Sequence, residues 1–183
     1  HVRLMEGLQL QLGGRSWQCV SGLGHSPEHM ALWCEADRIF ISGDMLLPSI
    51  SSNISVQAQE PEADPLAWFL QSLQQMKALL PPDSLVLPSH GRPFAGAHTR
   101  VAQLQAHHAE RLDELLAACR RQACSAHDVL SVLFRRTLNR QQMAFAMGEA
   151  IAHLHALWHA GQVQRRLDAS DGVYRFSAID AVA

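Results

Sequence analysis

The spacing of apolar residues changes once along this chain, near residue 99, and this change limits the folds that the sequence can adopt. Before that point the apolar runs are short, and residues 8–12 alternate with polar residues as half-buried strands do. After it, apolar residues recur every three or four positions, as in helices that bury one face. The sequence therefore predicts an α/β part over residues 1–109 and a mainly helical part over 110–183, with the boundary inside a long helix.

The same patterns predict individual elements. Short apolar runs bounded by turn residues predict strands at residues 8–12, 15–20, 30–34, 39–42 and 85–87. Asp64 and Pro65 are typical of a helix start. Beyond residue 99 three more helices are predicted, the second from Ser125 to Phe134, and a β-hairpin follows over residues 162–177. Three helices followed by a hairpin is the element order of a winged helix.

Three short motifs each place a histidine or an aspartate beside a glycine, directly after a predicted strand. They are GHSPEH at residues 24–29, SGD at 42–44 and PSHG at 88–91. A strand end followed by a tight glycine turn holds a side chain on a rigid scaffold. An aspartate after a glycine is by itself usually a turn residue. Imidazole and carboxylate groups together, however, suit zinc, iron or manganese, so the three motifs indicate a metal site.

In order and spacing these motifs resemble those of the metallo-β-lactamase-fold hydrolases. The resemblance implies that His25, Asp44 and His90 are metal ligands at the catalytic centre, with Asp44 bridging two ions and each histidine serving one. It implies zinc as the cofactor, as one or two ions, although iron or manganese would accept the same ligands. It also implies hydrolysis, in which metal-bound hydroxide attacks a carbonyl or phosphoryl centre.

The chain departs from the family pattern in two places. Glu28 stands where the motif usually has glycine, and His29 is either a residue that supports the ligands without binding metal or a purely structural one. The family's H-x-H-x-D-H motif, which lies tens of residues before the first of these motifs, is absent from the 24 residues that precede His25. The resemblance therefore implies that residues 1–109 are the C-terminal half of an αββα sandwich. It implies that residues 110–183 are the winged-helix-like domain found on one branch of the family.

A missing half has consequences for activity and assembly. Three ligands from one half cannot complete two metal sites, so we expect the isolated chain to bind metal poorly and to be inactive. The sheet face that would pack on the missing N-terminal half should be apolar and exposed. We therefore expect the chain to associate with that half or to form a homo-oligomer. A start at His1 rather than Met is expected of a truncated portion of a parent protein.

The function that the resemblance favours is hydrolysis of a small ester, thioester or lactone. The loop at residues 49–55 follows Asp44, so Ser52 and Asn53 are candidates for contacts with a small-molecule substrate, although a capped surface loop explains them equally well. Two alternatives stay open: cleavage of RNA by the same fold, and a non-catalytic winged helix that binds DNA. The acidic balance of residues 1–98 and the lack of Lys or Arg in residues 141–160 count against nucleic acid as a partner.

Five further histidines lie in the helical part: His107, His108, His153, His155 and His159. We interpret them as polar-face residues rather than as a metal cluster, because no third ligand accompanies the i, i+4 pair on the last helix. Arg165 and Arg166 lie in the predicted wing, where DNA-binding winged helices often contact phosphates. None of the four cysteines forms a C-x-x-C pair and no apolar run is long enough to cross a membrane. The sequence thus indicates a reducing, cytoplasmic compartment.

Overall fold

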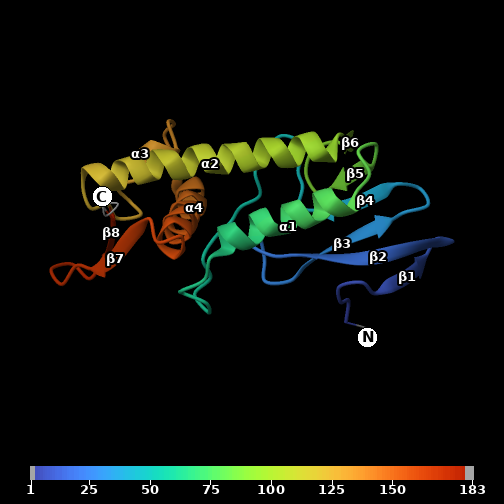
Figure 1. The fold of residues 1–183 in the computed structure, drawn as a ribbon, viewed down its shortest axis with the longest axis horizontal. Helices are drawn as coiled ribbons and strands as arrows, with labels where there is room; N and C mark the ends of the chain where they lie inside the picture. The colour runs from blue at the N-terminus through green and yellow to red at the C-terminus, as the bar shows by residue number, and fades with distance from the viewer. Residues whose placement is uncertain (1–2, 180–183) are drawn as a thin grey trace. The chain divides into compact units, whose positions relative to one another are not determined.

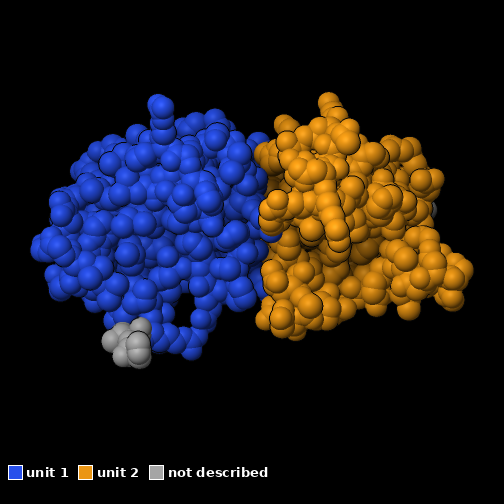
Figure 2. All heavy atoms as spheres, turned by 180° about the vertical axis from the view of Figure 1, so that it is seen from behind, with its two compact units in different colours: residues 1–53, 67–106 blue, residues 54–66, 107–183 orange. Residues whose placement is uncertain are grey.

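The structure, a computed structural model, describes residues 3–179. These residues form two compact units, which Figure 2 shows in different colours. Unit 1 contains the residues up to 53 together with 67–106, and unit 2 contains 54–66 together with the residues from 107 onward. Segment 54–66 thus belongs to unit 2 by its contacts, although unit 1 residues flank it in the sequence. The division into domains at residues 1–109 and 110–183 stays a prediction.

Unit 1 is built around a six-stranded sheet with the order β1-β2-β3-β4-β5-β6 (Figure 1). Its strands are β1 (Gln9–Leu12), β2 (Arg15–Gly22), β3 (His29–Cys34), β4 (Ile39–Gly43), β5 (Leu85–Pro88) and β6 (Phe94–Ala95). Neighbouring strands are antiparallel except β4 and β5, which are parallel. A parallel pair needs a long crossover connection, and this one contains helix α1 (Pro65–Leu79). The five predicted strands and the helix that begins at Pro65 are confirmed, and the two-residue β6 is an addition.

One face of the sheet is buried. The strand register places five buried side chains on it: Val20, Ala31, Trp33, Phe40 and Val86. Helix α1 contributes Phe69, Leu73 and Met76, all fully buried, to the core of the same unit. The hydroxyl of Ser72 on α1 accepts a hydrogen bond from the backbone N–H of Leu23, which follows β2. Burial of these aliphatic and aromatic side chains is what holds the helix and the strands together.

The opposite face of the sheet is apolar but incompletely covered. The register places on it the buried Trp17, Cys19 and Cys34 together with six apolar side chains that are not buried: Met30, Leu32, Ile39, Ile41, Leu85 and Leu87. Strand β1 is also more exposed than expected at its last residue. Leu8 and Leu10 are partly buried and Gln9 and Gln11 exposed, as the predicted alternation requires, but Leu12 at the end of the strand is exposed. β1 lies at the edge of the sheet, where burial is less complete.

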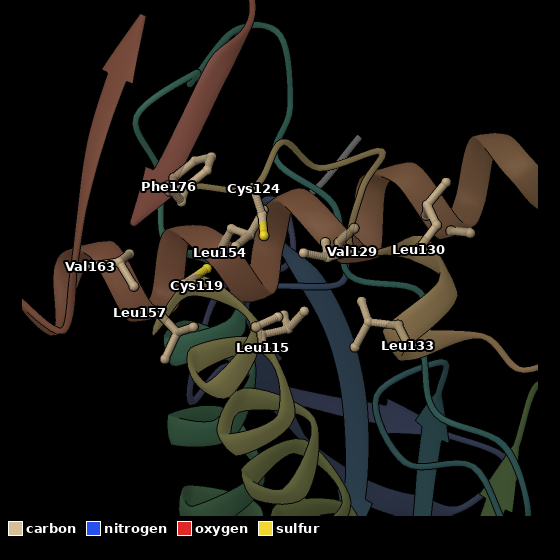
Figure 3. Close-up of a cluster of buried hydrophobic side chains, with 13 residues drawn as sticks. Leu115, Cys119, Cys124, Val129, Leu130, Leu133, Leu154, Leu157, Val163 and Phe176 are labelled. Atoms are coloured by element: carbon tan, nitrogen blue, oxygen red, sulfur yellow. The ribbon is translucent and has the colours of Figure 1, made fainter. Parts of the chain in front are cut away.

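Unit 2 is mainly helical. Its elements are the part of α2 (Ala97–Arg121) from residue 107 onward, α3 (Leu130–Leu133), α4 (Arg140–His159) and the hairpin of β7 (Val163–Leu167) and β8 (Tyr174–Ala178). Figure 3 shows its core, in which Leu115, Leu154 and Phe176 come from α2, α4 and β8. A capping box begins α4: the Asn139 side chain accepts from the Gln142 backbone N–H, and the Gln142 side chain accepts from that of Asn139.

The predicted helix from Ser125 to Phe134 is much shorter than expected. Only residues Leu130–Leu133 are helical, because the Asp128 carboxylate accepts hydrogen bonds from the backbone N–H and the hydroxyl of Ser125 and closes a turn. The last helix and the hairpin are confirmed, whereas the name winged helix for this unit stays a prediction. Among residues 3–179, no helix has the length and apolarity that crossing a membrane would require.

Candidate metal centre

The three motifs converge because of the direction in which their strands run. β4 and β5 are parallel, and β2 has the same direction because β3 lies antiparallel between β2 and β4. The carboxyl ends of these three strands therefore meet at one edge of the sheet. His25 lies three residues after β2, Asp44 directly after β4 and His90 two residues after β5. The topology alone brings the predicted site residues together.

The Asp44 carboxylate lies between the two imidazoles. His25 Nε2 lies 3.3 Å from Asp44 Oδ2, and His90 Nε2 lies 3.5 Å from Asp44 Oδ1. Each carboxylate oxygen thus faces a different histidine. The side chains of His25 and Asp44 are 24% and 30% exposed, whereas that of His90 is 68% exposed. The cluster is therefore open to solvent on the His90 side.

Two glycines make this approach possible. Gly43 and Gly91 have φ angles of +52° and +88°, a region that side chains disfavour. Space is lacking as well, since a Cβ atom at residue 43 would lie 2.4 Å from His29 Nε2 and one at residue 91 would lie 2.6 Å from Pro48 Cγ. The SGD and PSHG motifs therefore require their glycines for the turns that aim Asp44 and His90.

Ser89 is a site residue to which the sequence interpretation assigns no role. Its hydroxyl donates a short hydrogen bond to Asp44 Oδ1, and its backbone N–H donates to the Gly43 carbonyl oxygen at 3.1 Å. The hydroxyl bond, with the nearby His25 and His90, holds the pKa of Asp44 below its usual value against the opposing effect of burial. Asp44 is therefore ionised at neutral pH. The position of Ser89 within the PSHG motif is the sequence signal that could have identified it.

The orientation of His25 is fixed from its other side. His25 Nδ1 donates a hydrogen bond to the backbone carbonyl oxygen of Asn53 at 2.8 Å, so this nitrogen carries a proton. In the neutral ring Nε2 then presents a lone pair to Asp44. Two acceptors at 3.3 Å need a cation between them, either a proton or a metal ion. A protonated Nδ1 bonded to a carbonyl, with Nε2 left free, is the usual state of a metal-binding histidine.

The donor set fits half of a metal site. Two ligand atoms on a tetrahedral zinc ion lie about 3.3–3.4 Å apart, given bonds of about 2.0–2.1 Å, which is close to both nitrogen–oxygen distances. Among residues 3–179, however, no group of three or more His, Cys, Asp or Glu side chains is disposed around one ion. Each ion would receive one imidazole and one carboxylate oxygen from these residues. The remaining ligands would have to come from elsewhere.

His29 supports Asp44 through the backbone. The backbone N–H of Asp44 donates to His29 Nε2 at 3.2 Å, and burial lowers the pKa of His29, which keeps its ring neutral. Its Nδ1 is buried and has no hydrogen-bond partner among the described residues. Glu28, the departure from the family motif, forms an exposed ion pair with Arg3. Arg38 is the only non-glycine residue with positive φ in the described range, so the turn at residue 28 does not require glycine.

The loop after Asp44 contacts the site through its backbone and one hydroxyl. The Ser52 hydroxyl donates a short hydrogen bond to the Asp44 carbonyl oxygen, and Ser52 is buried. Asn53 contacts His25 through its main-chain carbonyl. Both residues thus shape the surroundings of Asp44 and His25. Their contact with a substrate stays a prediction.

The histidines of unit 2 differ from the sequence interpretation. His108, His153 and His155 are buried, so their assignment to a polar face is wrong. His108 Nδ1 donates to His153 Nε2 at 3.1 Å, and His153 Nδ1 donates to the Glu149 carbonyl oxygen at 2.8 Å. Burial lowers the pKa of His108 to about 3 and that of His153 to about 4. Both rings are therefore neutral members of a hydrogen-bonded core.

Arg165, in the predicted wing, is engaged in contacts within unit 2. Its guanidinium forms an ion pair with Glu62 and lies over the rings of Trp158 and Tyr174. The Arg165 side chain is only 11% exposed. Arg165 therefore lacks the accessible charge that a phosphate contact needs, whereas its neighbour Arg166 is exposed.

Similar proteins indicate the class of fold to which this chain is related. Residues 112–179 match the family model of the metallo-β-lactamase-like, C-terminal domain. The probable metallo-hydrolase YqjP of Bacillus subtilis (strain 168) is 24% identical over 157 residues, which is 84% of this chain and 48% of the relative. A solved β-lactamase domain protein from Burkholderia ambifaria is 51% identical with a TM-score of 0.94, covering 98% of this chain and 52% of that one.

A second solved structure agrees. The metallo-β-lactamase family protein TTHA1429 from Thermus thermophilus is 30% identical with a TM-score of 0.83, covering 96% of this chain and 54% of that one. The mixed α/β fold is thus that of the metallo-β-lactamase class. The chain is similar to metallo-β-lactamase-like proteins over nearly its whole length, as the motif resemblance predicts. It spans about half the length of the relatives that it matches.

Proposed function

We propose that this chain supplies one half of the metal centre of a hydrolase that cleaves a small ester, thioester or lactone. His25, Asp44 and His90 would hold one or two ions, with zinc as the expected metal. The observation that carries the proposal is the position of the Asp44 carboxylate, whose two oxygens face two different imidazoles. The name of the Bacillus subtilis relative, a probable metallo-hydrolase, supports the same class of reaction.

The residues of this chain would prepare the site before a metal arrives. The Ser89 hydroxyl donates to the Asp44 carboxylate and further stabilises its ionised form by lowering its pKa. Asn53 keeps Nε2 of His25 directed at Asp44 by accepting the proton on Nδ1. His90, exposed at the rim, leaves one side of the cluster open for substrate. A bound metal ion would supply Lewis acidity and a water-derived nucleophile near neutral pH.

The proposal requires a second half. No described side chain adds a third ligand for either ion, and the matched relatives are about twice as long as this chain. The incompletely covered face of the sheet, with the partly buried Leu32, Ile41 and Leu87 in one row across three strands, is the kind of apolar surface that packs on another layer. We propose that an N-terminal half binds this face, and that copies of the chain associate through it when that half is absent.

A fused protein tests the proposal. It joins this chain to the part of the Burkholderia ambifaria relative that the chain does not match. We expect the fused protein to retain one or two equivalents of zinc, iron or manganese and to hydrolyse at least one member of an ester, thioester and lactone panel. The isolated chain should retain little metal and show no turnover. A metal-free, inactive but folded fused protein would contradict the proposal, as would selective cleavage of RNA.

A further inference from the structure

Helix α4 has a glycine in its interior, Gly148, where glycine normally weakens a helix. Glycine at such a position costs about 1 kcal/mol relative to alanine. The structure gives a reason for it: a Cβ atom at residue 148 would lie 2.2 Å from Ser55 Oγ and 2.9 Å from Ser55 Cβ. Both residues belong to unit 2. Segment 54–66 therefore packs directly against the backbone of α4, and glycine permits this approach.

Ser55 follows closely on the residue that fixes His25. The carbonyl oxygen of Asn53 accepts the hydrogen bond from His25 Nδ1. The next residue, Ile54, is fully buried, and Ser55 then contacts Gly148. Residues 53–55 thus form a continuous stretch of chain that begins at the hydrogen-bond acceptor of His25 and ends at the residue packed against the backbone of α4. Little slack is available in a chain of this length, because consecutive Cα atoms are only about 3.8 Å apart.

The far end of segment 54–66 is held by an ion pair between the exposed Glu62 and the nearly buried Arg165. The two carboxylate oxygens of Glu62 lie 2.9 and 2.6 Å from Nη2 of Arg165. The guanidinium carbon of Arg165 lies 3.9 Å from the ring centroid of Trp158 and 4.4 Å from that of Tyr174. A guanidinium stacked between two rings is weakly hydrated and fixed in direction. Glu62 is therefore tied to both α4 and the hairpin.

Two backbone contacts strengthen the same attachment. His155 Nδ1 donates to the Ala63 carbonyl oxygen at 3.0 Å, and His159 Nε2 donates to that of Glu62 at 2.7 Å. Both histidines are on α4. Segment 54–66 thus contacts α4 both near its beginning, at Ser55, and near its end, at Glu62 and Ala63.

We propose that unit 2 supports the candidate metal centre, with Gly148 and Arg165 as positioning residues. They hold segment 54–66, and through it Asn53, so that His25 keeps Nε2 directed at Asp44. The inference rests on the proposed function, because the orientation of His25 matters for chemistry only at a working metal site. It gives the C-terminal unit a role within the enzyme and explains why Arg165 is enclosed.

Replacement of Gly148 tests the first attachment in the chain itself. Gly148→Ala should displace Ser55, speed the hydrogen exchange of backbone amides 50–56 by about tenfold or more, and remove the single Nδ1-protonated NMR signature of His25. Ser55→Gly removes the clashing atoms, so the double variant should regain both properties. Unchanged exchange and an unchanged His25 signature in Gly148→Ala would overturn the proposal, and so would a double variant that fails to recover them.

Two neighbouring arginines provide a matched pair for the second attachment. Arg165→Met and Arg166→Met make the same chemical change on adjacent residues of β7, but only Arg165 contacts Glu62. Arg165→Met should speed amide exchange across residues 57–63 by several-fold, whereas Arg166→Met should leave it unchanged. Equal effects of the two substitutions, or none from Arg165→Met, would contradict a positioning role.

Zinc affinity separates this inference from the proposed function. In the fused protein, Gly148→Ala should weaken zinc binding by about tenfold, the loss typical of a residue that supports a ligand, and the double variant should restore it. A fused protein that does not bind zinc even without substitution would refute the proposed function, while the exchange results still decide the inference. Normal zinc binding in both the parent and Gly148→Ala would refute the inference alone.

Discussion

Histidines occupy two contrasting settings in this chain. In unit 1, His25 and His90 lie in loops at strand ends, reach solvent and face a shared carboxylate. In unit 2, His108 and His153 lie on helices, are fully buried and bond to each other and to a backbone carbonyl. Both pairs bring imidazoles close together. The partner of the imidazole differs: one pair faces a carboxylate, whereas the rings of the other donate to each other and to a backbone carbonyl, with the Arg111 cation nearby.

This difference teaches what distinguishes a ligand from a core residue. A metal ion needs anionic and neutral donors whose lone pairs are free, and Asp44 with two Nε2 atoms provides them. In the buried pair, each donated hydrogen already has an acceptor, and burial opposes any added charge. Histidine content therefore does not locate the metal site. We propose that a carboxylate held between imidazoles does.

The largest expected effect is that of removing the shared charge. Asp44→Asn keeps the shape of the side chain but removes the charge that we propose to bind the metal. It should weaken zinc binding by the fused protein by at least about a thousandfold, or about 4 kcal/mol, measured by competition with a chelator. Asp83→Asn, at an exposed carboxylate paired with Arg38, is the matched control and should change nothing. Equal zinc affinities for Asp44→Asn and the parent would place the metal elsewhere.

Acid should weaken unit 2 through its buried pair. His108 and His153 have a folded-state pKa of about 3 and about 4, against an ordinary value of 6.5, so below 6.5 the unfolded chain binds more protons than the folded one. Stability is therefore full above 6.5 and falls as pH drops toward 4. From pH 7 to 5.5 the free energy of unfolding should fall by about 3 kcal/mol, measured by urea denaturation.

The control for this acid effect replaces both rings. His107 further lowers the pKa of both rings, and Arg111 lowers that of His153. The hydrogen bond from His153 to the Glu149 carbonyl opposes this by raising the pKa of His153. The double variant His108→Leu/His153→Leu removes the titrating groups, so its stability should depend much less on pH over the same interval. An equally steep dependence in that variant would assign acid sensitivity to other groups.

Removing one ring of the His108–His153 pair should lower the free energy of unfolding slightly less than acidification does. His153→Ala leaves a cavity and leaves the buried Nδ1–H of His108 without its acceptor. We expect a loss of about 2–3 kcal/mol in the free energy of unfolding. The double leucine variant should lose less than the single alanine variant, since it leaves no unpaired donor. If the double leucine variant lost more stability than His153→Ala, the unpaired hydrogen-bond donor would not be the cause of the loss.

The smallest predicted effect concerns the start of α4. Asn139→Ala removes the side-chain oxygen that accepts from the Gln142 backbone N–H and should cost about 1 kcal/mol. Zinc binding by the fused protein should not change, because α4 holds segment 54–66 further along the helix, from Gly148 to His159. Asn139→Ser, which retains a capping oxygen, should recover most of the stability. A loss of zinc affinity in Asn139→Ala would extend the support of the metal centre further along α4 than we propose.

The sequence predicts most of unit 1 because its signals are local. Alternation, turn glycines and Pro65 define the strands and α1, and the direction of the strands then brings His25, Asp44 and His90 together. Ser89 was not predictable in the same way, because its hydroxyl acts across 45 residues on Asp44.

Unit 2 is less predictable because its key contacts join distant residues. Arg165 meets Glu62 across 103 positions, which no local pattern reveals. His108 was predictable in part, since it shares the apolar stripe of its helix with Leu104, Leu112 and Leu115. The shortness of α3 follows from how the Asp128 side chain closes its turn, a detail that helical spacing does not encode.

The most direct test of the account is a titration of the chain with Co²⁺ followed by NMR, since paramagnetic broadening detects even weak binding. The account predicts that the signals of His25, Asp44 and His90 broaden first and together, while those of His108 and His153 stay sharp. Broadening that begins at the helical histidines, or that never reaches Asp44, would contradict the claim that a carboxylate between two imidazoles is the metal centre.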